Sequence, residues 1–207
     1  MALTQDQITA SIDALAAIEP GFAAALGRIG YPAPRIRAPG YETLLRTIVG
    51  QQVSVASAAA VWTRLEAELG LGCDPAVLLA RDSDALRACG LSRQKQGYAR
   101  SLAELVLSGG LDLHQLPADD EEAIAALVSV KGIGRWSAEI YLLFAEGRAD
   151  VWPAGDLAVQ IEVGRILGHD ERPSEKAIRD LAEAWRPHRG AAAILAWHHY
   201  KVDMAVI

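Results

Sequence analysis

Apolar residues recur along most of this chain at intervals of three and four positions, the spacing that gathers them on one face of an α-helix. Three such runs hold, in chain order, Ile8, Ile12 and Leu15, then Leu44, Leu45 and Ile48, and then Trp136, Ile140 and Leu143. The chain has no useful length of the alternating pattern typical of strands, no internal repeat and no low-complexity tract. The pattern therefore predicts an all-α protein.

Polar residues and prolines mark where the early helices begin and end. Thr4 and Gln7 have the spacing of a capping box, and Pro20-Gly21 ends the helix that they begin. Ser54 is placed to cap a further helix that runs to about Leu69.

Similar signals place the later helices. One is expected from about Arg93 to Leu107, and Asp119 or Asp120 caps the helix that leads into a glycine-rich turn. Pro173 predicts the first turn of another helix, and the last helix begins near Pro187.

The segment GYPAPRIRAPG, residues 30–40, holds three prolines and two glycines, a composition typical of a connection between structural elements. A break of this kind early in an all-α chain of 207 residues predicts two helical lobes.

Composition narrows the class of protein. Half of the residues are hydrophobic, so a disordered chain is excluded, and the formal charge of −6 argues against tight non-specific binding to DNA, although a local basic face remains compatible with it. The N-terminus has no signal-peptide pattern and no apolar run reaches membrane-spanning length. We expect a soluble, intracellular (cytoplasmic) protein that binds no membrane, with Cys73 and Cys89 reduced.

A tight glycine turn, Val130 to Gly134, separates two of the helical patterns. Its glycines permit backbone conformations that a side chain would obstruct, and the amides that begin the following helix suit a phosphate. Lys131 and Arg135 flank the turn with positive charge. A helix-turn-helix corner without any ligand is the alternative interpretation.

The wider pattern around this turn resembles the helix-hairpin-helix DNA glycosylase superfamily, and within it the alkylation-repair branch, DNA-3-methyladenine glycosylase II. The segments that carry the resemblance are Leu127-x-x-x-Lys131-Gly132-Ile133-Gly134-x-Trp136-Ser137-Ala138, Pro153-Ala154-Gly155-Asp156, Ile48 to Ser54 and Leu91 to Lys95. The resemblance covers roughly residues 40–207. It implies a central helical lobe of about residues 40–150, a second lobe made of the N-terminal helix and about residues 156–207, and a substrate cleft between the lobes.

Asp156 opens an apolar-periodic helix, so an ordinary N-cap explains it without any chemistry. The resemblance places the catalytic aspartate at this position. A carboxylate held ionised at a helix N-terminus can stabilise the oxocarbenium-like sugar that forms as the base departs, and it can orient or deprotonate the attacking water.

Trp136 stands where superfamily members that also cut the DNA backbone carry a lysine, which attacks the sugar as an amine. The resemblance therefore implies that water is the nucleophile and that the product is an abasic site in an intact strand. It also implies a base pocket formed by Trp136, Ile140 and Trp152, where core packing is the competing interpretation of Trp136. Better-known bacterial members have a tyrosine in place of Ile140; here Tyr141 comes next.

Other residues match the DNA contacts of the family. Gln51 and Gln52 stand at a turn between helices, where the resemblance makes Gln52 the wedge that fills the gap left by a flipped nucleotide; a solvent-exposed amide pair is the alternative. Arg93 and Lys95, at a helix start, are candidate phosphate contacts, as are Lys131, Gly132, Gly134 and Arg135 of the glycine turn.

No cofactor is expected apart from one ion. Hairpins of this family often hold a monovalent cation, Na⁺ or K⁺, through backbone carbonyls, which would be those of Val128, Val130 and Ile133. Some relatives carry an iron–sulfur cluster near the C-terminus, but there is no cysteine from Val159 onward, so no such cluster is expected.

The resulting hypothesis is a monofunctional glycosylase, a monomer, that flips alkylated purines out of double-stranded DNA and hydrolyses the N-glycosidic bond. A non-catalytic helix-hairpin-helix DNA-binding module is the alternative, and Asp156 discriminates between them because a binder has no use for a carboxylate at the sugar. An all-α protein-interaction domain would leave the glycine turn without a ligand.

Overall fold

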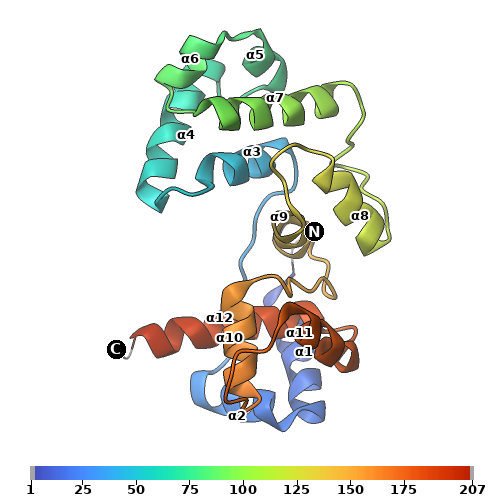
Figure 1. Cartoon of the computed structure of the whole chain (residues 1–207). Helices are drawn as coiled ribbons and strands as arrows, with labels where there is room; N and C mark the ends of the chain where they lie inside the picture. The colour runs from blue at the N-terminus through green and yellow to red at the C-terminus, as the bar shows by residue number, and fades with distance from the viewer. Residues whose placement is uncertain (1–2, 206–207) are drawn as a thin grey trace. The chain divides into compact units, whose positions relative to one another are not determined.

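The structure, a computed structural model, describes residues 3–205, and all regular structure in that range is helical (Figure 1). The prediction of an all-α protein is confirmed. The chain divides into two compact units, a central unit from Ala38 to Tyr141 and a terminal unit made of the residues up to Arg37 together with those from Leu142 onward. No helix among the described residues is long and apolar enough to cross a membrane.

The central unit is built from seven helices. They are α3 (Tyr41–Gly50), α4 (Val55–Leu69), α5 (Pro75–Ala80), α6 (Ser83–Ala88), α7 (Arg93–Leu107), α8 (Asp120–Val128) and α9 (Arg135–Tyr141). Helix α7 packs against α3 and α5, and α3 packs against α4 (Figure 1). The apolar faces predicted from the spacing meet here, because Leu44, Leu45 and Leu102 are fully buried.

The terminal unit joins the two ends of the described chain. Its elements are α1 (Gln5–Ile18), α2 (Pro20–Ile29), a π-helical turn η1 (Leu142–Glu146), α10 (Leu157–Ile166), α11 (Glu175–Ala182), a 3₁₀ turn η2 (Glu183–Trp185) and α12 (Arg189–Ala205). Helix α12 lies against α1, α2 and α10. Ile12 and Leu15 are fully buried, and the ring of Phe22 meets that of Trp185 edge-on at 5.0 Å between centroids.

The predicted caps are mostly confirmed. Thr4 and Gln7 form the capping box, Ser54 accepts a hydrogen bond from Ser57 N at 3.2 Å, and Asp119 caps α8. The prediction for Pro173 is wrong: α11 begins at Glu175, because the hydroxyl of Ser174 accepts from Ala177 N and so provides the cap.

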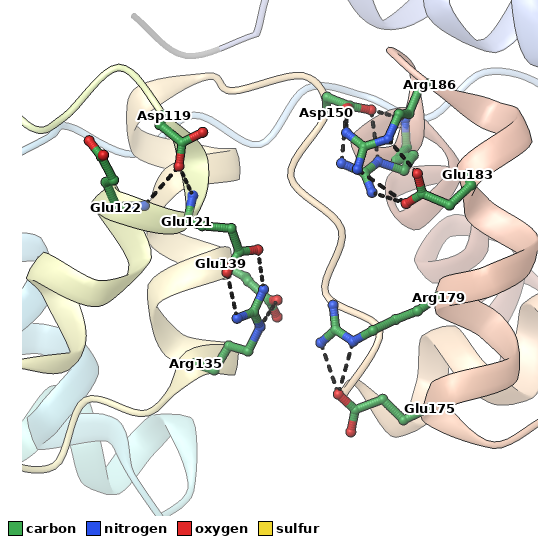
Figure 2. Close-up of polar contacts among 11 residues, drawn as sticks. Asp119, Glu121, Glu122, Arg135, Glu139, Asp150, Glu175, Arg179, Glu183 and Arg186 are labelled. Carbon is green, nitrogen blue, oxygen red and sulfur yellow. Dashed lines mark hydrogen bonds and ion pairs between the residues drawn. The ribbon is translucent and has the colours of Figure 1, made fainter.

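A network of ion pairs fastens the loop before Asp156 within the terminal unit (Figure 2). The carboxylate of Asp150 accepts from Arg186 at 2.8 Å and from Arg189 at 2.9 Å, and Glu183 bonds to both arginines. The hydrogen bond from Arg186 lowers the pKa of Glu183. Because α12 begins at Arg189, the network fixes this loop, at Asp150, against the first turn of that helix.

Candidate functional site

The predicted glycine turn is a hairpin between α8 and α9, and it is anchored within the central unit. Val130 and Ile133 are buried, and Ile133 N donates to Val130 O at 3.0 Å across the turn. Lys131 N donates to the hydroxyl of Ser101 on α7 at 3.2 Å. The hairpin is therefore a rigid projection of the core and not a loose loop.

The two glycines of the hairpin differ in what they do for the fold. Gly132 has a φ of +84°, and a Cβ atom there would lie 2.2 Å from the ring of Tyr98, so both backbone and packing require glycine. Gly134 has no left-handed φ, and a Cβ atom there would meet nothing within 4 Å. Since the fold does not need glycine at 134, its backbone is open to the close approach of a group from outside the chain.

Arg135 at the start of α9 is held by two carboxylates (Figure 2). Its Nη1 and Nη2 donate to Glu121 at 2.8 and 2.5 Å, and its Nε donates to the buried Glu139 at 2.9 Å. The hydrogen bond to Glu121 leads the causes that raise the pKa of Arg135. A phosphate contact by this guanidinium has to compete with Glu121, whereas Lys131 is exposed on the hairpin itself.

The two glutamines that follow α3 have different environments. Gln51 Nε2 donates to Gly132 O at 2.7 Å, so this side chain joins the loop to the hairpin. Gln52 is exposed and has a φ of +55°, a conformation that costs a non-glycine residue about 1–3 kcal/mol. An exposed side chain on a strained turn is consistent with the wedge prediction for Gln52, which stays a prediction. The hydrogen bond of Gln51 to a backbone carbonyl removes the alternative of a solvent-exposed amide pair.

The first turn of α7 carries the other two predicted DNA contacts. Arg93 is exposed. Lys95 is half-buried, and its Nζ donates to Val49 O at 2.7 Å near the end of α3; burial lowers its pKa. Lys95 thus satisfies a carbonyl of the last turn of α3, and only Arg93 presents its charge mainly to solvent.

Asp156 lies in the terminal unit, at the N-cap of α10. Its Oδ1 accepts from Val159 N at 2.9 Å and from the indole Nε1 of Trp197 at 3.2 Å. The turn before it is closed by Asp156 N donating to Pro153 O at 2.9 Å. The side chain is therefore an N-cap, as the sequence predicts, and also a carboxylate whose orientation two donors restrain.

The tryptophan that contacts Asp156 is Trp197 on α12, which is not among the site residues predicted from the sequence. Its ring lies 5.5 Å from that of Phe144. Trp152 is buried, donates to Ile178 O at 3.3 Å and packs edge-on against Trp185, so core contacts account for it. Its predicted place in the base pocket stays a prediction.

In the central unit, α9 carries the other two residues of the predicted base pocket. Ile140 is buried, but 47% of Trp136 is exposed, which is unusual for a large aromatic side chain and argues against simple core packing. The predicted site residues are therefore divided between the units: the carboxylate of Asp156 is in the terminal unit and the exposed indole of Trp136 is in the central unit.

Comparison with known proteins gives one consistent result. The sequence profile described as HhH-GPD superfamily base excision DNA repair protein matches residues 45–187. The chain is 32% identical over 166 residues to DNA-3-methyladenine glycosylase 1 of Schizosaccharomyces pombe, an alignment that covers 78% of this chain and 73% of that protein. It is 34% identical over 188 residues to DNA-3-methyladenine glycosylase 2 of Escherichia coli, covering 84% of this chain and 64% of that protein.

A solved structure agrees. The 3-methyladenine DNA glycosylase of Schizosaccharomyces pombe, in a complex with abasic DNA, matches with a TM-score of 0.77 at 27% identity. The match covers 94% of this chain and 96% of that one.

Proposed function

This chain belongs to the HhH-GPD superfamily of base excision DNA repair proteins, and from that premise we propose that it removes alkylated purines of the 3-methyladenine type from double-stranded DNA by hydrolysing the N-glycosidic bond. The observation that carries the proposal is the geometry of Asp156, a carboxylate fixed at a helix N-terminus by Val159 N and Trp197 Nε1. The names of the similar proteins support the substrate class.

In this mechanism Asp156 acts on the sugar. Departure of the alkylated base leaves positive charge on the deoxyribose, and a carboxylate already oriented by two hydrogen bonds stabilises that charge without reorganising. The positive end of the α10 dipole lies beside the carboxylate and attracts its negative charge. The same group orients, or takes a proton from, the water that attacks the sugar.

The central unit supplies binding to DNA. The open backbone of Gly134 admits a phosphate oxygen close to the amides at the start of α9, and exposed Lys131 adds a positive charge beside it. Gln52 fills the gap in the duplex, and the exposed indole of Trp136 stacks on the flipped, electron-poor base.

A monovalent cation at the hairpin belongs to the same proposal, and the residues present suit one. Val128 is the last residue of α8, where helical carbonyls lack partners within the helix, and Val130 lies two positions after it. Val130 O accepts one hydrogen bond, from Ile133 N, and a carbonyl oxygen has a second lone pair. The carbonyls of Val128, Val130 and Ile133 would hold Na⁺ or K⁺, which supplies a positive charge for a phosphate oxygen.

Asp156→Asn tests the catalytic assignment. The amide keeps the shape and an oxygen for the N-cap but removes the charge. We therefore expect excision from methylated duplex DNA to fall by about 10²- to 10³-fold, as when a main electrostatic contact to a transition state is lost. Binding to a duplex with an abasic-site analogue should stay the same or tighten. Near-native turnover by Asp156→Asn would refute the catalytic role of Asp156. A native chain that binds DNA but excises no base would instead favour the non-catalytic DNA-binding module.

We further propose that the chain has no lyase activity. A Schiff base needs a neutral amine beside the sugar carbon, and Trp136 occupies that point of the motif. Incubation with methylated DNA and borohydride should trap no covalent complex, and strands should break only after alkali. Robust trapping that disappears in Lys131→Ala would make Lys131 the nucleophile instead.

A further inference from the structure

A buried carboxylate–imidazole pair joins the two helices that carry Asp156 and Trp197. Glu162 on α10 is fully buried and His199 on α12 is 2% exposed. Oε2 of Glu162 lies 2.6 Å from Nδ1 of His199. Burying two polar groups such as these costs desolvation free energy, which apolar side chains of the same volume would not cost. A contribution to stability is therefore a weak reason for the pair to be present.

Two arginines complete the network. Arg165 Nη1 donates to Oε1 of Glu162 at 2.7 Å, and Nη2 of Arg28, on α2, contacts Nε2 of His199. A guanidinium only donates hydrogen bonds, so Nε2 of His199 is the acceptor and the proton on Nδ1 is donated to Glu162. The neutral imidazole with its proton on Nδ1 satisfies both neighbours and links α2, α10 and α12.

Helices α10 and α12 pack against each other, and the bond from Trp197 Nε1 to Asp156 Oδ1 joins them a second time. Trp197 and His199 are two positions apart on α12, so their side chains leave different sides of the helix. Two bonds from different sides restrict both the rotation of α12 about its axis and its sliding along α10. The Glu162–His199 bond therefore controls where the indole of Trp197 meets the carboxylate.

We propose that Trp197 is a positioning residue for the carboxylate of Asp156 and that the Glu162–His199 pair positions Trp197; the inference rests on the proposed catalytic role of Asp156. The indole restrains the carboxylate plane, and the buried pair restrains the indole. Loss of either bond lowers the rate of glycosidic cleavage while binding to DNA is unchanged, because small displacements of a reacting group cost rate and not affinity.

Two isosteric variants of His199 separate positioning from mere stability. In His199→Asn the side-chain amide nitrogen replaces Nδ1 and still donates to Glu162. In His199→Gln the side-chain amide oxygen replaces Nε2, so that it accepts from Arg28 while the bond to Glu162 is lost. Trp197→Phe keeps a ring but removes the indole N–H. Trp197→Phe still tests the positioning role of the indole if either His199 variant fails to fold.

The first measurement is the ¹H–¹⁵N spectrum of the tryptophan indoles in the whole chain. The Trp197 signal is identified by its absence from Trp197→Phe. We expect His199→Gln to shift that signal while the signals of Trp62 and Trp136, in the central unit, stay in place, and His199→Asn to leave all of them close to native. An unmoved Trp197 signal in His199→Gln would overturn the proposal.

The second measurement is single-turnover release of 3-methyladenine from duplex DNA treated with N-methyl-N-nitrosourea. We expect His199→Gln and Trp197→Phe to be slower by about tenfold or more, the scale of losing a hydrogen bond to a charged group. Their affinity for a duplex with a tetrahydrofuran abasic analogue should match that of the native chain, and His199→Asn should keep most of its rate. If both His199 variants lose rate equally, and in proportion to a lowered Tm, the Glu162–His199 pair has only a structural role.

Failure of this inference is distinguishable from failure of the proposed function. If Asp156→Asn stays active, the catalytic assignment fails whatever the His199 variants do. If Asp156→Asn is inactive while His199→Gln and Trp197→Phe cleave at the native rate, only the positioning role is lost.

Discussion

The two hairpin glycines form a matched pair for one experiment, since alanine at each adds the same methyl group to a different environment. At Gly132 the methyl carbon would lie 2.2–2.5 Å from three ring atoms of Tyr98, at a φ of +84°. Alanine in a left-handed conformation costs about 1–2 kcal/mol, and overpacking of this kind costs about 1–3 kcal/mol. The free energy of unfolding should therefore fall by roughly 2–5 kcal/mol, which lowers Tm by roughly 5–15 °C in a chain of this size.

Gly134→Ala should behave in the opposite way. The methyl group meets no protein atom within 4 Å, so the free energy of unfolding should stay within about 0.5 kcal/mol of native. Affinity for DNA should fall about 10- to 100-fold, because the methyl group obstructs a hydrogen bond to a charged phosphate, which is worth about 1.5–3 kcal/mol. A phosphate contact carries no base identity, so damaged and undamaged duplexes should lose affinity equally.

Thermal unfolding followed by circular dichroism measures the first effect, and fluorescence anisotropy with labelled duplexes measures the second. Tyr98→Ala combined with Gly132→Ala serves as a control, since it relieves the clash and leaves the backbone strain. The reasoning about an open Gly134 is refuted if Gly134→Ala unfolds at a much lower temperature, or if it binds undamaged DNA as tightly as the native chain. A loss of affinity confined to duplexes with one kind of lesion would indicate that the hairpin contacts the flipped base and not a phosphate.

Two further variants or treatments probe the central unit. Glu121→Gln should free the guanidinium of Arg135 for a phosphate and raise affinity for undamaged DNA by up to about fivefold, as expected for an exposed ion pair. Glu122→Gln removes the same charge without removing a partner of Arg135. An equal gain in affinity there would show that the net charge, and not the release of Arg135, is responsible. Burial raises the pKa of Cys73 to about 12 and also raises that of Cys89, so iodoacetamide at pH 8 should label both thiols only after denaturation. Thiol ionisation should reduce stability only as the pH rises from about 9 toward 12, where the unfolded state loses its protons first; rapid labelling of the folded chain would contradict the burial.

Helix starts could be predicted from the sequence because a cap is a local interaction. The hydroxyl or carboxylate of Thr4, Ser54 or Asp156 bonds to an amide three positions along, so both partners stand in one short segment. The prediction for Pro173 failed for the same local reason. Ser174 follows it, and a hydroxyl that accepts from the third amide determines the first residue of a helix more strongly than a nearby proline does.

Contacts between distant segments could not be predicted in this way. Glu139 lies four positions after Arg135 on one helix, and that spacing would have indicated the pair. Glu121 lies fourteen positions earlier on another helix, and Trp197 lies forty-one positions after Asp156; nothing in a single sequence relates such residues. The π-helical turn at Leu142–Glu146 was missed too, because its apolar run is equally compatible with an α-helix.

The division of the chain also sets the order in which its parts are completed during synthesis. Helices α1 and α2 are made first, but α10 and α12, against which they pack, are made only after the whole central unit. The central unit is continuous, so it has all its partners while the ribosome is still translating the rest. A nascent chain therefore carries a finished hairpin before the indole of Trp197 reaches Asp156. A chain that stalls between the two stages has the residues proposed to contact DNA but no hydrogen bond from Trp197 to the carboxylate.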